Sequence, residues 1–267
     1  MTVKKNTGLI RIENVSHTFN TDTGALPVLD DLTLSVPKNG FTAIVGPSGC
    51  GKSTVTRLVA GLLKPDKGTV WLQGQKVNTP RDIVGMAFQN PVLLEWRTIL
   101  QNVMLPLEIV SNALSLAERE ARAQDLLKLV GLSGFGHKRP SELSGGMRQR
   151  ASLCRALVHW PEVLILDEPF GALDAFTRED LWQTMQRLRE EEPFTGVLIT
   201  HDLRESIFLA DEVVVLSGRP ATVQYCQKLK QRGAKSLDQL YTPEAIEILN
   251  ILREQIKIAR KDEEDRL

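Results

Sequence analysis

Residues 41–54 read FTAIVGPSGCGKST. The first five are apolar and β-prone, which predicts a short buried strand. Small residues form a loop after it, and the pattern from Thr54 to Leu63 predicts a helix. A strand, a glycine loop and a helix in this order are the setting in which the G-x-x-x-x-G-K-S/T motif binds phosphate. The stretch therefore predicts an α/β fold built around a phosphate loop.

The phosphate loop supplies backbone donors, a cation and a hydroxyl. Its small residues let the N–H groups from Ser48 to Thr54 point at phosphate oxygens. Lys52 can reach the outer phosphates, and the Ser53 hydroxyl can bind Mg²⁺. A dinucleotide fingerprint fits poorly, because the glycines are not spaced as G-x-G-x-x-G. The nucleotide-binding residues expected in this loop are Gly46, Pro47, Ser48, Gly49, Cys50, Gly51, Lys52, Ser53 and Thr54.

A second motif, LSGGMRQR at residues 143–150, predicts another phosphate contact. Ser144, Gly145 and Gly146 stand just ahead of a helix with one apolar face, and a bare helix N-terminus attracts anions. One nucleotide seldom needs two such cradles from one chain. The two motifs therefore suggest two copies of the chain that share two nucleotides.

The composition limits the compartment and the partners. The chain has 267 residues with 33 basic and 33 acidic side chains, so its formal net charge is zero and nothing global points to nucleic acid. Three scattered cysteines without C-x-x-C spacing fit a reducing cytosol. The N-terminal MTVKKNTGLIRIENV lacks the apolar core of a signal peptide, and no apolar run approaches about 18 residues, so we expect no membrane span.

Hydrophobic periodicity predicts the order of the elements. Alternating patterns predict half-exposed antiparallel strands, and bare apolar runs predict buried parallel strands. The alternating strands are expected at Leu9–Phe19 and Leu32–Pro37, and the buried parallel strands at Val163–Leu166 and Val197–Thr200. Further strands are expected at Gly68–Leu72, where a turn follows, at the short apolar run Val84–Phe88 and at Val213–Leu216. Helical patterns fill residues 91–160, including Leu116–Val130 and Gly146–His159, and resume from Ser236 to Leu267.

These elements predict an α/β protein. Its expected parts are a phosphate-loop, RecA-like parallel sheet, an N-terminal antiparallel β-subdomain and an inserted α-helical subdomain. The expected limits are 1–235 for the nucleotide-binding domain, about 91–160 for the helical subdomain and 236–267 for a C-terminal helical tail. In such sheets ligands lie outside the C-terminal ends of the strands.

Two carboxylates follow the apolar run VLIL at residues 163–166. Asp167 can bind Mg²⁺ through water, and Glu168 can polarise the attacking water. An acidic pair after a strand is often only a turn, but a phosphate loop requires such an aspartate.

Three further side chains have two interpretations each. His201 follows a parallel strand, so it can hydrogen-bond a γ-phosphate or serve the structure alone. Gln89 follows a strand and can bind Mg²⁺ through its amide oxygen, a weak signal in isolation. Phe19 either stacks on adenine or belongs to the core.

Together these pieces resemble the ATP-binding subunits of ABC transporters over almost the whole chain up to about Ala221. The phosphate loop, Gln89, LSGGMRQR, LILDEP, the GALD loop at 171–174 and ITHD at 199–202 appear in the family's order. The resemblance implies ATP and Mg²⁺ as cofactors. Phe19 replaces the family's commoner tyrosine.

The resemblance also implies a role for each residue. Phe19 stacks on adenine, Gln89 senses Mg²⁺ and couples the subunits, and Ser144 to Gly146 clamp phosphate across a dimer. Glu168 becomes the general base, and His201 the γ-phosphate switch. Asp174 becomes part of a loop through which the two copies communicate.

Longer runs narrow the subgroup. LLEWRTILQNVMLPLE, FGALDAFTRED and LSGRPATV look most like the nitrate, sulfonate and taurine importers, a group that includes bicarbonate and pyrimidine-precursor systems. This implies an ATPase on the cytoplasmic side of the inner membrane that powers import of a small solute. Its partners are a second copy in a head-to-tail ATP sandwich or a homologous ATPase subunit, separate permease subunits and, indirectly, a periplasmic or lipid-anchored solute-binding protein.

Two other functions stay open. One is an ATPase for lipid transport or efflux that uses the same nucleotide-binding and catalytic residues. The other is a non-transport ABC ATPase acting on nucleic acid or ribosomes, which a single neutral domain disfavours. The sequence does not name the solute, because the solute touches the permease and the binding protein.

The stretch NPVLLEWRTILQNVMLPL at residues 90–107 mixes apolar anchors with charges. It can form the core edge of the helical insert, or a groove for a short cytoplasmic helix of the permease. In the second interpretation Trp96 and Arg97 face the permease.

Overall fold

The computed structural model describes residues 8–22, 24–110, 113–229 and 235–264. The chain forms two compact units: residues 1–81 with 195–267 make unit 1, and residues 82–194 make unit 2. The N-terminal residues 1–7, the last three residues of the expected tail and the pair 111–112 of the expected helical insert lie outside the described residues. The domain limits expected from sequence remain predictions.

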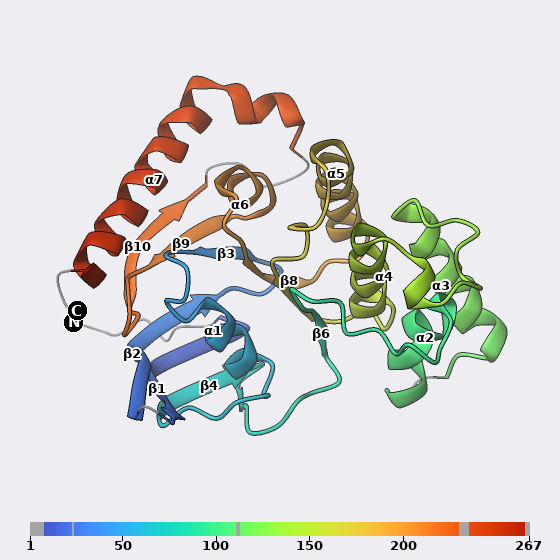
Figure 1. Cartoon of the computed structure of the whole chain (residues 1–267), viewed down its shortest axis with the longest axis horizontal. Helices are drawn as coiled ribbons and strands as arrows, with labels where there is room; N and C mark the ends of the chain where they lie inside the picture. Colours follow the sequence, from blue (N-terminus) through green and yellow to red (C-terminus); the bar gives the residue numbers. More distant parts are fainter. Residues whose placement is uncertain (1–7, 23, 111–112, 230–234, 265–267) are drawn as a thin grey trace. The chain divides into compact units, whose positions relative to one another are not determined.

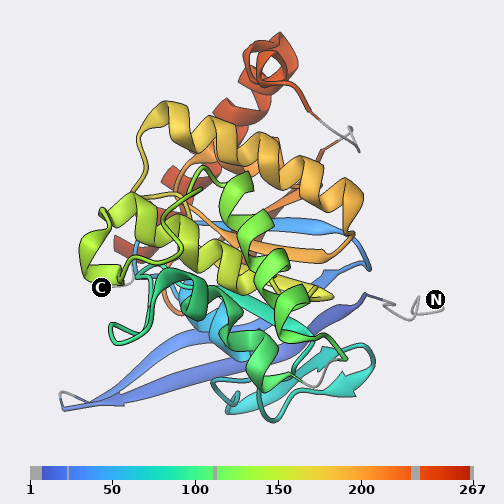
Figure 2. The same cartoon turned by 90° about the vertical axis from the view of Figure 1, so that its right-hand side faces the viewer.

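Unit 1 contains an antiparallel sheet in the order β2-β1-β4-β5, formed by β1 (Ile10–Thr21), β2 (Gly24–Val36), β4 (Lys67–Leu72) and β5 (Gln75–Lys76). Figure 2 shows β1 and β2 as a long blue hairpin. Alternate residues of β1, such as Ile10 and Ile12, are buried, as their spacing predicts. β2 begins eight residues earlier than the strand expected from Leu32, because its outer part pairs with β1 and needs no apolar face.

Unit 1 also contains the strands that carry the phosphate loop. β3 (Phe41–Val45) lies parallel to β8 (Thr195–Ile199) and β9 (Glu212–Leu216), and β10 (Val223–Lys228) pairs antiparallel with β9. Every residue of β3 and β8 is buried. The sequence patterns located these three parallel strands but missed β10, whose residues are half-exposed and polar.

Unit 1 contains the α-helices α1 (Lys52–Val59), α6 (Leu203–Leu209) and α7 (Pro243–Glu264) among its described residues. The expected helix Thr54–Leu63 is wrong at both ends, because α1 begins directly after Gly51 and a turn with Gly61 at φ 74° follows it. The expected tail helix is likewise shorter, with a 3₁₀ turn η2 (Leu237–Tyr241) before α7. α7 packs against α6, β9 and β10 (Figure 1).

Unit 2 contains two parallel strands, β6 (Val84–Ala87) and β7 (Val163–Asp167), with Val84 beside Val163 and Ala87 beside Leu166. Its helices are α2 (Ile99–Ile109), α3 (Leu116–Leu129), the 3₁₀ turn η1 (Pro140–Glu142), α4 (Gly145–Leu157) and α5 (Ala175–Glu191). The expected helical pattern from residue 91 is wrong for residues 91–98, which form a loop. Asn102 stabilises that loop by accepting from the Leu94 N–H and donating to the Leu94 and Thr98 carbonyls.

Candidate functional site

The phosphate loop connects β3 to α1 in unit 1. Its glycines adopt left-handed backbones, with φ of 155° at Gly46, 78° at Gly49 and 116° at Gly51, which L-residues with a Cβ rarely adopt. A Cβ on Gly51 would also lie 2.7 Å from a methyl group of Val28. The glycine spacing is therefore a requirement of this backbone.

Lys52 closes the loop from inside. Its Nζ donates to the carbonyls of Gly46 at 3.0 Å and Pro47 at 2.6 Å, and only 8% of the residue is exposed. The N-cap residue of α1 is Gly51, which offers no side-chain cap. An ammonium group and a helix N-terminus without a side-chain cap provide the positive potential that a phosphate needs, so the loop fits ATP.

Phe19 lies on β1 and is half-buried, in register with Leu26 of β2. The buried ring of His17 stands edge-on to it, with centroids 4.7 Å apart. One part of the Phe19 ring therefore packs against a buried side chain. The chemistry fits either interpretation of Phe19, because a half-exposed ring can both pack and stack.

The carboxylates of unit 2 stand at the end of β7. Asp167 is 5% exposed and follows four buried apolar residues. Glu168 has a left-handed backbone with φ 48°, a conformation that costs a non-glycine residue about 1–2 kcal/mol. The Gln89 side chain donates from Nε2 to Glu168 Oε2 at 3.2 Å. Two residues 79 positions apart are thus brought together.

His201 is exposed in a loop that hydrogen bonds hold on both sides. The Asp202 N–H donates to Thr200 Oγ1, and the Asp202 carboxylate caps α6 by accepting from the N–H groups of Arg204 and Glu205. Thr200 in turn donates its hydroxyl to the buried Glu205. The imidazole therefore projects from a loop whose backbone is held in place.

The LSGG motif begins α4. Ser144 is the N-cap, and its hydroxyl accepts from the Met147 N–H at 3.3 Å. A Cβ on Gly145 would meet nothing within 4 Å, whereas one on Gly146 would lie 2.9 Å from a Leu173 methyl group. Gly145 therefore leaves the helix N-terminus uncovered, and Gly146 permits the close approach of residues 172–173.

Asp174 caps α5. Its carboxylate accepts from the Thr177 N–H at 3.0 Å and from the Thr177 hydroxyl at 2.7 Å. These hydrogen bonds hold the pKa of Asp174 below its ordinary value. The structure thus gives Asp174 a local capping role.

Gln149 and Arg155 hold the backbone around Gln89 in place. The sequence motifs did not point to either residue. Gln149, 2% exposed, donates from Nε2 to the Phe88 carbonyl at 3.2 Å, and Arg155 donates to the Val92 carbonyl. Burial lowers the pKa of Arg155. Both residues lie on α4, so the LSGG helix and the Gln89 segment form one connected element. In the sequence, the one sign of this role is that the polar Gln149 lies on the apolar face of the helix that became α4.

The comparisons identify the family. The protein-family model described as "ABC transporter" matches residues 29–171, which are more than half of the chain. The chain belongs to the ABC transporter family. It is 44% identical to the nitrate import ATP-binding protein NrtD of Synechococcus elongatus, over 81% of this chain and 79% of that one. It is 42% identical to the bicarbonate transport ATP-binding protein CmpD of Synechocystis sp., over 81% and 77%.

A solved structure agrees with the fold of this ABC cassette. The ABC transporter cassette MJ0796, solved as a dimer, is 33% identical with a TM-score of 0.77, and the match covers 84% of this chain and all of that one. A second structure of MJ0796, with ADP and Pi, gives the same TM-score at 32% identity and the same coverage. The α/β phosphate-loop fold expected from sequence is confirmed.

The cassette's candidate Mg²⁺ ligands are oxygen donors. The residues expected to hold the ion are Ser53 in unit 1 and Gln89 and Asp167 in unit 2, a hydroxyl, an amide oxygen and a carboxylate. Oxygen donors of this kind suit Mg²⁺. The described residues contain no cluster of three or more His, Cys, Asp or Glu side chains that could hold a metal. The described helices include none long and apolar enough to cross a membrane.

Proposed function

We propose that this chain is the ATP-binding and ATP-hydrolysing subunit of a bacterial ABC importer. One observation carries the proposal: a glycine loop closed around the buried Lys52 occurs in the same chain as Glu168, which follows a buried aspartate and accepts a hydrogen bond from Gln89. The first arrangement suits phosphate binding, and the second suits activation of a water molecule.

The residues divide the chemistry among them. The loop N–H groups and Lys52 bind the phosphates, and Lys52 exchanges its two loop carbonyls for phosphate oxygens. Glu168 takes a proton from the attacking water, while its hydrogen bond to Gln89 orients the carboxylate. His201 donates to the γ-phosphate, and Phe19 stacks on adenine. Mg²⁺, held by Ser53, Asp167 and Gln89, would neutralise developing negative charge when bound.

A second copy completes each nucleotide site. The N-terminus of α4 is uncovered at Gly145. In the sequence, the phosphate loop lies far from it, at residues 46–53. We infer that Ser144, Gly145 and Gly146 bind the γ-phosphate held by the other copy. The dimeric structure of the MJ0796 cassette supports the pairing of two copies. Asp174, whose carboxylate caps α5, links the two copies through the GALD loop.

The permease binds beside the Gln89 segment in this proposal. Trp96 is 73% exposed and Val92 is 57% exposed, so these apolar side chains are available as anchors for a partner. A cavity of about 550 Å³ lies nearby in unit 2, lined in part by Thr98, Leu100 and Leu127. A short cytoplasmic helix of the permease fits such a surface. The chain would then be a peripheral subunit on the cytoplasmic side of the inner membrane.

The imported solute is a small anion in our proposal. The relatives named above are import proteins for nitrate and bicarbonate, and the solute would be delivered by a solute-binding protein. Transport of lipid or efflux is the alternative with the same catalytic residues. No nucleic-acid partner is expected from a formal net charge of zero.

Reconstitution tests the proposal. The chain is combined with the permease and binding protein from its own genome in vesicles that contain ATP and Mg²⁺. We expect uptake of radiolabelled nitrate or bicarbonate that stops when ATP is omitted. Release of a preloaded solute, or movement of lipid without the binding protein, would support the alternative instead.

A further inference from the structure

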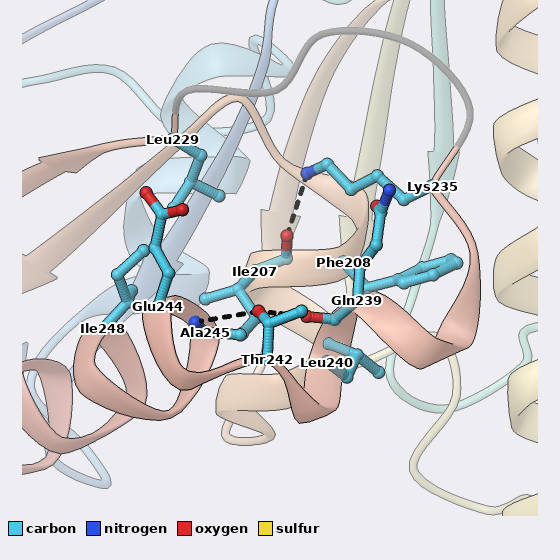
Figure 3. Close-up of a pocket in the computed structure, with 10 residues that line it drawn as sticks. All are labelled: Ile207, Phe208, Leu229, Lys235, Gln239, Leu240, Thr242, Glu244, Ala245 and Ile248. Atoms are coloured by element: carbon cyan, nitrogen blue, oxygen red, sulfur yellow. Dashed lines mark hydrogen bonds between the residues drawn. The ribbon is translucent and has the colours of Figure 1, made fainter.

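A cavity lies in unit 1 beside the contact of α6 with the C-terminal tail. Its volume is about 170 Å³. Figure 3 shows the residues around it, which come from α6, from Leu229 just after β10 and from the tail between Lys235 and Ile248, which includes η2 and the first turns of α7. The apolar part of the wall consists of Ile207, Phe208, Leu229, Leu240, Ala245 and Ile248. Phe208, Leu240 and Ile207 are 1%, 6% and 7% exposed, so packing holds these walls in place.

Most of the polar side chains that line the cavity already have hydrogen-bond partners. Lys235 donates from Nζ to the carbonyls of Ile207 at 2.9 Å and Ala210 at 2.8 Å, which end α6. Thr242 donates to the Gln239 carbonyl and accepts from the Ala245 N–H, which caps the first turn of α7 (Figure 3). The Lys235 bonds tie the tail to α6, and the Thr242 bonds hold the turn between η2 and α7.

Gln239 is the exception. Its Oε1 atom is buried and has no hydrogen-bond partner among the described residues, and its side chain lines the cavity. A buried acceptor without a donor is unfavourable. A molecule in the cavity that carries an O–H or N–H group could supply the donor after a small rotation of this side chain.

The two helices that form walls of the cavity continue to the surroundings of His201. α6 begins at its cap Asp202, the residue after His201. On α7, Ile248 lines the cavity, and the next residue, Leu249, lines a second cavity together with His201, Arg204 and Arg253. A molecule that changes the spacing of α6 and α7 would therefore change the surroundings of His201.

We propose that the cavity between α6 and the tail is a binding site for a small effector with a compact apolar body and one O–H or N–H donor, and that its occupancy changes the rate of ATP hydrolysis through His201. The size follows from the volume, since an apolar cavity of about 150 Å³ binds benzene. Phenol, one ring with one hydroxyl donor, matches both requirements. The rate effect rests on the proposed function, whereas binding does not.

Binding is tested on the full chain by NMR with ¹³C-methyl isoleucine, using phenol and benzene as probes. We expect both to shift the methyl signals of Ile207 and Ile248 and to leave Ile258, which lies outside the cavity lining, unchanged. Gln239→Leu should weaken phenol binding by about tenfold and leave benzene binding intact, because one hydrogen bond is lost. Ala245→Leu should abolish binding of both by filling the space.

Glu247→Leu is the matched control, since it adds the same side chain to α7 at an exposed position outside the cavity. It should bind both probes like the wild type. Thermal unfolding shows that each variant is folded. Absent shifts at Ile207 and Ile248, or equal shifts at Ile258, would overturn the site.

The rate effect is measured separately, as ATP hydrolysis at saturating ATP with and without phenol. We expect phenol to change the rate of the wild type and of Glu247→Leu but not of Ala245→Leu. Phenol that binds without changing the rate would overturn the coupling to His201. A wild-type chain that does not hydrolyse ATP would contradict the proposed function, while the NMR measurement would still decide the site.

Discussion

Gln89 donates a hydrogen bond from Nε2 to Glu168 Oε2 over 3.2 Å. The bond joins the second residue after β6 to the first residue after β7, and these strands are parallel neighbours. Gln149 and Arg155 of α4 hold the backbone on either side of Gln89. A displacement of α4 or of the segment after Gln89 would therefore move the partner of the proposed catalytic carboxylate.

Glu168→Gln should reduce ATP hydrolysis by at least about 100-fold, because the amide keeps the shape but loses the base. ATP binding should persist, and a dimer should accumulate with ATP and Mg²⁺ on size-exclusion chromatography. Glu162→Gln, an exposed carboxylate just before β7, serves as control and should keep the wild-type rate. Hydrolysis by Glu168→Gln at the wild-type rate would remove Glu168 from the mechanism.

The left-handed backbone of Glu168 predicts a stability effect separate from catalysis. Glu168→Gly should raise the free energy of unfolding by up to about 1 kcal/mol, since glycine relieves the strain at φ 48°. Glu168→Val should lower it by about 1 kcal/mol or more. Urea unfolding measures the free energy of unfolding of both variants. Glu162→Gly is the control and should lower the free energy of unfolding, as glycine does at a residue with an ordinary negative φ. The same sign for the glycine and valine variants would argue against strain.

Lys52→Ala should weaken ATP binding about 10- to 100-fold, because a charged hydrogen-bond donor to phosphate is lost. Isothermal calorimetry measures the affinity. Lys38→Ala removes an equal charge at an exposed position and should bind ATP like the wild type. Equal affinities of all three proteins would contradict the role of Lys52.

Ser144→Arg should block hydrolysis in the opposite copy, because a long side chain covers the N-terminus of α4. Ser144→Ala controls for the lost helix cap, which alone costs about 1 kcal/mol. A mixed dimer with Ser144→Arg in one copy and Glu168→Gln in the other retains one intact composite site and should hydrolyse ATP. A dimer with both changes in one copy has none and should be inactive. Equal activity of the two mixed dimers would reject shared sites.

Trp96→Ala should abolish transport in reconstituted vesicles and preserve the basal ATPase rate of the isolated chain, because the side chain is 73% exposed. Arg97 is a poorer first choice than its sequence suggests, since it forms an ion pair with Glu108 at 2.8 Å. Asn102→Ala is the contrasting variant. It removes a buried side chain that holds the loop at Leu94, so it should lower the melting temperature and impair both activities. Unchanged transport by Trp96→Ala would exclude the residue from the permease contact.

Periodicity predicted the elements whose burial follows from local pattern. The strand at Phe41–Val45 and the first four residues of the strand at Val163–Asp167 are apolar, β-prone runs, and α3 begins at a capping box formed by Ser115 and Glu118. β10 escaped prediction because its polar residues are held by pairing with β9. The loop at residues 91–98 escaped because a buried side chain from the next helix satisfies its backbone.

The phosphate loop, the LSGG motif, the carboxylates at the end of β7 and hence the family can be read from the amino-acid sequence alone, because each motif is a short run whose chemistry depends on spacing along the chain. The contact between Gln89 and Glu168, the left-handed backbone of Glu168 and the cavity beside α6 arise from the folding of the whole chain. These features depend on which distant segments pack together. That packing is a sum of many weak contacts over the whole fold, and no local run of residues encodes it.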